Sequence, residues 1–121
     1  MIDKRGDYIK KLINWQLSSN NLVVLKRDSV ECEFVNNIIT FHEDENTINE
    51  IDMDKKTFRR ENKDFMFKID FINQTFNYHL KIEDLSIENA KIDANLKTYN
   101  NQIILQYNLG DETKEIIIHI L

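Results

Sequence analysis

The chain has 121 residues, 41% hydrophobic and 31% charged, which is the composition of one globular domain over residues 1–121 rather than of a disordered segment. Its formal net charge of −5 disfavours a general nucleic-acid or anionic-membrane surface, because both require a basic excess. No window approaches the roughly 20 apolar residues of a spanning helix, and residues 1–6 lack the apolar run of a signal peptide. We therefore expect a cytoplasmic protein that binds neither nucleic acid nor membrane.

Turn residues are unusual for a β protein, because the chain has no proline and only two glycines. Tight hairpin turns need residues that tolerate positive φ, and asparagine is the next best choice after glycine. Short polar pairs fall between the apolar runs and predict the turns: Asn20-Asn21, Asn36-Asn37, Asn73-Gln74, Asn100-Asn101 and Gly110-Asp111.

The first element, Tyr8 to Leu17, fits two patterns. Tyr8 and Trp15 fit a helical spacing, whereas Ile13, Trp15 and Leu17 alternate as in a strand, which is the interpretation we favour. Trp15 is the only tryptophan. A core or rim anchor is its expected role, with ligand stacking as the alternative.

A first hairpin follows the short apolar run at residues 22–25. Apolar and polar residues alternate over 30–34, and after the asparagine turn residues 38–41 should place Ile39 and Phe41 inward. The single cysteine, Cys32, has no partner for an internal disulfide, and Glu31 and Glu33 beside it should raise its thiol pKa. A reactive thiol is therefore not expected.

The next segment is acidic and then basic. Residues 44–54 offer oxygen ligands, but Ile48 and Ile51 occupy positions where a calcium loop needs polar groups or glycine, so a strand with an irregularity, or a short link that enters a strand, is predicted. Arg59 and Arg60, in a cluster with nearby lysines, could contact an anion, because guanidinium groups match such ligands in a bidentate manner. The alternative is that the acidic residues around Glu43 and Glu61 neutralise this cluster.

The clearest hairpin spans residues 65–82. Phe65, Phe67, Ile69 and Phe71 alternate with polar residues, and a second alternating row begins at Phe76 after the turn. A period of two places one apolar row on the inner face of each strand. This predicts a half-buried antiparallel pair that needs a facing layer.

The rest of the chain continues the pattern. Residues 87–96 mix small and large apolar side chains, which suits a tapering barrel, although a helix there is the alternative. Residues 102–109 and 114–121 predict a final hairpin with extra apolar residues, which should be covered on both faces or meet a partner chain, such as a second copy in a weak homodimer through an edge strand.

These elements predict an all-β protein, an antiparallel meander of about 8–10 strands with at most one short helix. Closure into a barrel is favoured, because it removes edges at which an isoleucine-rich sheet without proline could aggregate.

The order of the segments also resembles a known family. It runs from an apolar strand at Val30 through the Asn36-Asn37 turn, an acidic segment, Phe58-Arg59-Arg60 and the 65–71 strand to the closing strand with Tyr107. This order resembles that of the YwiB-like proteins, a small bacterial family of unknown function with a calycin-like, lipocalin-like β-barrel. The resemblance implies that fold and brings no catalytic residues.

Chemistry motifs are sparse. His42, His79 and His119 lie far apart without zinc-type spacing, and the latter two should point outward. With Gly6 and Gly110 as the only glycines, no phosphate-binding loop is available. We therefore expect no metal and no cofactor, and no catalytic residues can be named.

Two functional interpretations stand ahead of an enzyme. In the first, the barrel binds a small apolar ligand in its interior or at its mouth. In the second, aromatic side chains fill the interior and the outside binds a protein partner; the density of the aromatic rows slightly favours a packed interior. The candidate ligand contacts are Trp15, Phe65, Phe67, Phe71, Phe76, Tyr78 and Tyr107.

Overall fold

The computed structural model describes residues 9–121, which form eleven strands and contain no helix. The strands are β1 (Ile9–Ser19), β2 (Leu22–Val35), β3 (Ile38–His42), β4 (Ile48–Asp52), β5 (Thr57–Glu61), β6 (Phe65–Asp70), β7 (Thr75–Leu80), β8 (Leu85–Lys91), β9 (Ala94–Thr98), β10 (Gln102–Leu109) and β11 (Glu112–Ile120). The predicted all-β class is confirmed. The strand prediction for Tyr8 to Leu17 is confirmed from Ile9 onward, Tyr8 lying outside the described residues, and the alternative helix at residues 87–96 is wrong, since β8 and β9 cover it.

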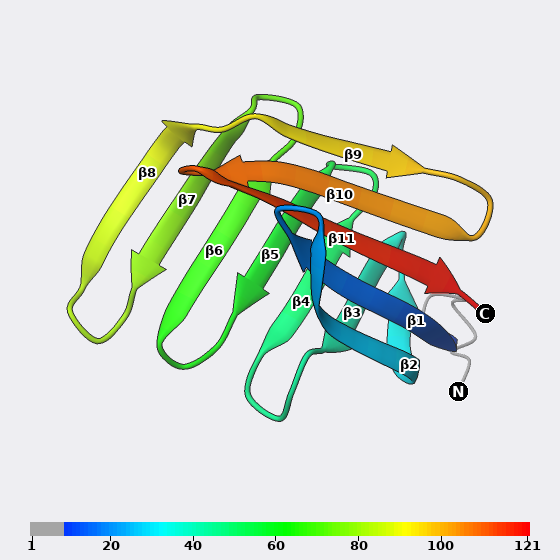
Figure 1. Cartoon of the computed structure of the whole chain (residues 1–121). Coiled ribbons are helices and arrows are strands. Elements are labelled where there is room, and N and C mark those ends of the chain that lie inside the picture. The colour runs from blue at the N-terminus through cyan, green and yellow to red at the C-terminus, as the bar shows by residue number, and fades with distance from the viewer. Residues whose placement is uncertain (1–8) are drawn as a thin grey trace.

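All strands belong to one antiparallel sheet, in the order β8-β7-β6-β5-β4-β3-β2-β1-β11-β10-β9. The chain therefore meanders from β1 to β8 and returns on the other side of β1 with its last three strands. The sheet curls into a half-barrel, and Figure 1 shows β9, β10 and β11 running across the upper part of the green strands β5 to β7.

The predicted closure into a barrel of 8–10 strands is wrong, because there are eleven strands and the two outer ones, β8 and β9, do not pair within the described part of the chain. The two strands follow each other in the chain, but the residues that connect them, Ile92 and Asp93, form hydrogen bonds with other strands and loops. The Ile92 amide donates to the Gln74 carbonyl, and the Asp93 carbonyl accepts from the Asn108 amide. The Gln74 side chain also bonds both backbone groups of Ala94, at 2.6 and 2.9 Å. These bonds direct β9 away from β8 and toward β10.

Asparagine turns replace the missing glycines at two of the predicted pairs, whereas Asn73, Asn100 and Asn101 do not have positive φ. Asn20 and Asn21 have φ of 51° and 67°, and Asn36 and Asn37 have φ of 51° and 63°. Positive φ at two successive positions suits the twist of a two-residue hairpin. Other loops use a side-chain oxygen that accepts two backbone amides, as Asp70 does from Ile72 and Asn73. These amide bonds, chiefly the one from Asn73, hold the pKa of Asp70 below its usual value.

The packed core occupies one end of the interior. Its members are inward residues at alternate strand positions, each at most 2% exposed: Ile13, Ile39, Ile51, Phe58, Ile69, Ile103, Leu105 and Ile118. The predicted inward positions of Ile39 and Phe41 are confirmed, since both are buried.

We predict that Ile51→Ala lowers the free energy of unfolding by about 2–5 kcal/mol, because the fully buried side chain leaves a cavity in close-packed surroundings. Ile72→Ala is the matched control, since Ile72 is 65% exposed and the same change there should cost less than about 0.5 kcal/mol. Urea unfolding followed by circular dichroism measures both. Equal effects of the two substitutions would contradict this placement of the core.

Candidate functional site

A cavity of about 570 Å³ occupies the other end of the interior. Most of its lining is apolar, and seven side chains are aromatic: Trp15, Phe41, Phe65, Phe67, Phe76, Tyr78 and Tyr107. Among the lining residues, Ile87 and Leu109 are 49% and 40% exposed, whereas Trp15 and Phe41 are at most 3% exposed. The cavity therefore meets solvent beside β8 and the β10–β11 turn, and it ends at β1 and β3.

Strand register builds one wall from a single row of directly opposed residues. Phe41 on β3 faces Asn49 on β4, and Asn49 faces Arg60 on β5. The row continues through Phe67 on β6 to Tyr78 on β7. Since opposed residues project from the same face of a sheet, these five side chains line the cavity together.

Aromatic contacts join this wall to the facing one. The Phe67 ring lies 5.8 Å from the Phe76 ring and 5.7 Å from the Tyr107 ring on β10, between ring centroids. Phe65 and Tyr78 stack at 6.1 Å. Such pairs add about 0.5–1.5 kcal/mol each beyond the burial of their surface. The lining is therefore held in place without a ligand.

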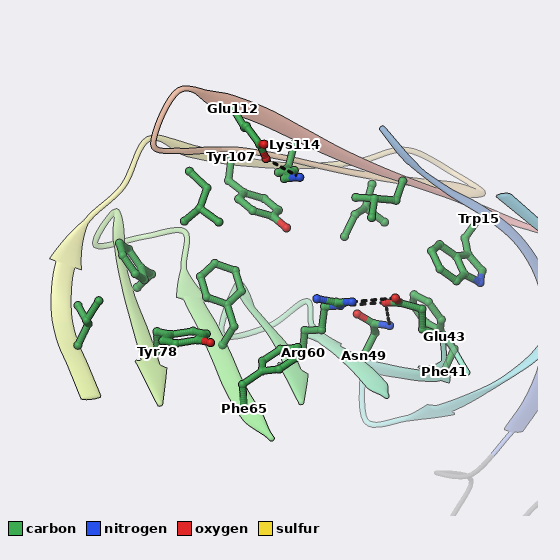
Figure 2. Close-up of a pocket in the computed structure, with 16 residues that line it drawn as sticks. Trp15, Phe41, Glu43, Asn49, Arg60, Phe65, Tyr78, Tyr107, Glu112 and Lys114 are labelled. Carbon is green, nitrogen blue, oxygen red and sulfur yellow. Dashed lines mark hydrogen bonds and ion pairs between the residues drawn. The ribbon is translucent and has the colours of Figure 1, made fainter. Parts of the chain in front are cut away.

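A charged pair lies inside the cavity, as Figure 2 shows. The Arg60 guanidinium donates from Nε to Glu43 Oε1 at 2.9 Å and from Nη2 to Glu43 Oε2 at 2.8 Å. Asn49 Nδ2 adds a longer bond of 3.4 Å to the same carboxylate. Arg60 also lies 5.3 Å from the centroid of the Phe65 ring, in a cation–π contact. The bonds to Glu43 raise the pKa of Arg60, so this arginine remains charged.

Tyr107 projects into the cavity from the facing wall, with its hydroxyl directed inward (Figure 2). Burial raises the pKa of Tyr107 to about 12, because the interior solvates a phenolate poorly. The positive charge of Arg60 opposes this effect, and the negative charge of Glu43 adds to it. The hydroxyl has no hydrogen-bond partner within residues 9–121. At neutral pH it is therefore a protonated donor facing the cavity.

A second charged pair lies at the rim. Lys114 Nζ on β11 lies 2.7 Å from a carboxylate oxygen of Glu112 and 3.2 Å from the Ser19 hydroxyl. The Glu112 side chain is 52% exposed, so solvent weakens this pair. Each cation that lines the cavity thus has its own carboxylate.

Six of the seven predicted aromatic contacts line the cavity, the exception being Phe71, which is buried in the core. Of the two arginines proposed for an anion, Arg60 lines the cavity and Arg59 does not. Arg59 lies on the other face of the sheet, where it bonds Glu61 and, at 3.3 Å, Glu50. The alternative that acidic neighbours neutralise the basic cluster is therefore confirmed for both arginines.

The residues that the sequence prediction missed are the polar ones in the cavity, Glu43, Asn49, Glu112 and Lys114. Alternation along the strands could have identified two of them, because residues two positions apart on a strand point to the same face. Glu43 is two residues after the inward Phe41, and Asn49 is two residues before the inward Ile51. The density of the aromatic rows slightly favoured a packed interior over a ligand cavity, whereas the interior is packed at one end and hollow at the other.

Other reactive groups lie elsewhere. Cys32 is buried, and burial is the main reason that its thiol pKa is raised, with Glu33 a smaller contribution. His79 pairs at 3.1 Å with the exposed Asp84, outside the cavity. Among the described residues, no group of three or more histidine, cysteine, aspartate or glutamate side chains could hold a metal ion.

No family model, curated protein or solved structure matches this chain. In the described part of the chain, no helix has the length and apolar character needed to cross a membrane.

The raised pKa of Tyr107 predicts a loss of stability in alkali. The unfolded chain loses this proton near pH 10, whereas the folded protein keeps it to about 12, so stability falls as pH rises through that window. The loss attributable to Tyr107 should be about 2–3 kcal/mol, since one pKa unit corresponds to about 1.4 kcal/mol. Urea unfolding between pH 9 and pH 12 measures it.

Tyr107→Phe is the control, because it keeps the ring and removes the ionisable group. Its free energy of unfolding should fall less steeply over the same pH range, because the contribution of Tyr107 is gone. Some decrease should remain, because the other tyrosines still ionise. Parallel curves for the two proteins would show that the Tyr107 hydroxyl is not buried as described.

Proposed function

We propose that this protein binds a small, largely apolar ligand in the half-barrel cavity. The observation that carries the proposal is a cavity of about 570 Å³ that is lined by seven aromatic side chains and a few inward polar groups. Sites for small molecules commonly have about 300–1,000 Å³, mostly apolar lining and a small number of polar groups that orient the ligand. An uncharged molecule with one or two rings or a short alkyl chain matches this space.

The placement of polar residues supports binding over a purely structural interior. A buried ion pair contributes little to stability, because removing both charges from water offsets most of their attraction. Apolar residues at the positions of Glu43 and Arg60 would fill the interior at no such cost. The resemblance to YwiB-like, calycin-like barrels belongs to this proposal, since barrels of that kind commonly hold small apolar ligands.

A neutral apolar dye tests the proposal. We expect Nile red to bind with one-to-one stoichiometry and to change the emission of Trp15, the only tryptophan and part of the lining. Tyr78→Ala should weaken binding about tenfold, because it removes an aromatic wall worth about 1–2 kcal/mol of contact. Fluorescence titration gives both dissociation constants.

Tyr99→Ala is the matched control, since Tyr99 is 59% exposed and lies outside the lining. It should leave the dissociation constant unchanged. Failure of the dye to bind, or an equal effect of both substitutions, would overturn the proposal. Native mass spectrometry of the protein purified from its source would then show whether any small molecule accompanies it.

We also propose weak self-association through an edge strand. The final hairpin, which was expected to be covered on both faces or to meet a partner chain, is internal to the sheet, whereas β8 is an edge strand. Nearly all of β8 is exposed, including Leu85 at 57%. An exposed strand edge with apolar side chains favours pairing with another strand.

Sedimentation velocity tests this second proposal. We expect a concentration-dependent dimer that Leu85→Lys abolishes, because a charge on an edge strand opposes pairing. Leu22→Lys is the matched control, since Leu22 is 72% exposed at the β1–β2 turn. A monomer at all concentrations, or equal loss in both variants, would contradict the proposal.

A further inference from the structure

The polar groups of the cavity restrict the ligand chemistry further, and this step rests on the proposed binding function. Arg60 uses Nε and Nη2 in its bonds to Glu43, and its Nη1 has no partner within the described residues. The Tyr107 hydroxyl likewise lacks a partner there. Figure 2 shows both side chains projecting into the cavity, Arg60 from β5 and Tyr107 from β10. These two side chains therefore offer two donors to a ligand, beside Trp15 Nε1, which is also buried without a partner among the described residues.

Charge in the cavity is balanced before any ligand binds. Glu43 is a bidentate partner of Arg60, and Glu112 is the partner of Lys114. A carboxylate ligand would add an unbalanced negative charge to an aromatic-walled site beside Glu43, and burying such a charge is costly. An ammonium ligand would find both Glu43 oxygens already accepting from Arg60. Both kinds of ion are therefore disfavoured.

We propose that the ligand is an uncharged, mainly apolar molecule with a carbonyl-type oxygen, which accepts hydrogen bonds from Arg60 Nη1 and the Tyr107 hydroxyl. Glu43 then has two roles. It holds the Arg60 guanidinium in position, and its charge discriminates against carboxylates. Specificity of this kind comes from an unfavourable interaction with the wrong ligand as much as from contacts with the right one.

Four naphthalene probes of similar size test the ligand class by isothermal titration calorimetry: 2-acetylnaphthalene, 2-ethylnaphthalene, 2-naphthoate and 2-naphthylmethylammonium. We expect 2-acetylnaphthalene to bind about tenfold more tightly than each of the others, because a hydrogen bond to a charged donor is stronger than one between neutral groups. Tyr107→Phe should reduce the preference for the acetyl over the ethyl compound about threefold to tenfold. This comparison requires no change at the ion pair.

Glu43→Gln tests the role of the charge, since glutamine keeps an oxygen acceptor for Arg60. We expect 2-naphthoate to bind about tenfold more tightly to this variant, with less than about threefold change for 2-acetylnaphthalene. Glu50→Gln is the matched control, because it removes one of the two carboxylate partners of Arg59 on the other face of the sheet. The control should leave all four affinities unchanged.

The outcomes separate this inference from the binding function. Tighter binding of 2-naphthoate by the unaltered protein, or no difference between the acetyl and ethyl compounds, would overturn the inference and leave the binding function intact. Binding of none of the four probes would also overturn it, and the Nile red titration would then decide the binding function independently.

Discussion

One constraint governs this molecule: each strand has a single inward face, and the inward side chains recur at every second residue. Where that row holds isoleucine, as at Ile39, Ile51 and Ile69, the two halves of the curled sheet pack closely. Where it continues into Glu43, Asn49 and Arg60, the halves do not close on each other, and a cavity remains. Core and site are thus two ends of the same rows, and no separate element is needed to build the site.

The ion pair inside the cavity depends on that arrangement for its stability. Asn49 and Arg60 are directly opposed on neighbouring strands, and Glu43 follows the end of β3, so all three side chains meet without a long loop. The side chain of Glu43 is 12% exposed, and such a carboxylate needs several donors to offset its loss of solvation. Arg60 supplies two of them and Asn49 a third. The orientation of the remaining Arg60 donor toward the cavity follows from this geometry.

Alternation in the sequence was sufficient to predict the strand class, the hairpin of β6 and β7, and six of the aromatic residues in the lining. It was insufficient for closure, because the direction of β9 depends on hydrogen bonds between the Gln74 side chain and Ala94, twenty residues away at the start of that strand. It also placed Arg59 and Arg60 in one cluster, although neighbouring residues on a strand point to opposite faces. Parity would have separated them and assigned Arg60 to the interior.

The open edges and the cavity have a common origin. If β8 and β9 paired, the half-barrel would close on the side where Ile87 and Leu109 now lie at the rim, and access to the interior from that side would be lost. The short link at Ile92 and Asp93 bonds to Gln74 and Asn108 instead, and this keeps the two outer strands apart. An unpaired edge is a risk for aggregation, and a sheet without proline has few residues to block it. Retention of that edge is consistent with the proposed entry of a ligand, and the same edge is the one through which we propose weak self-association.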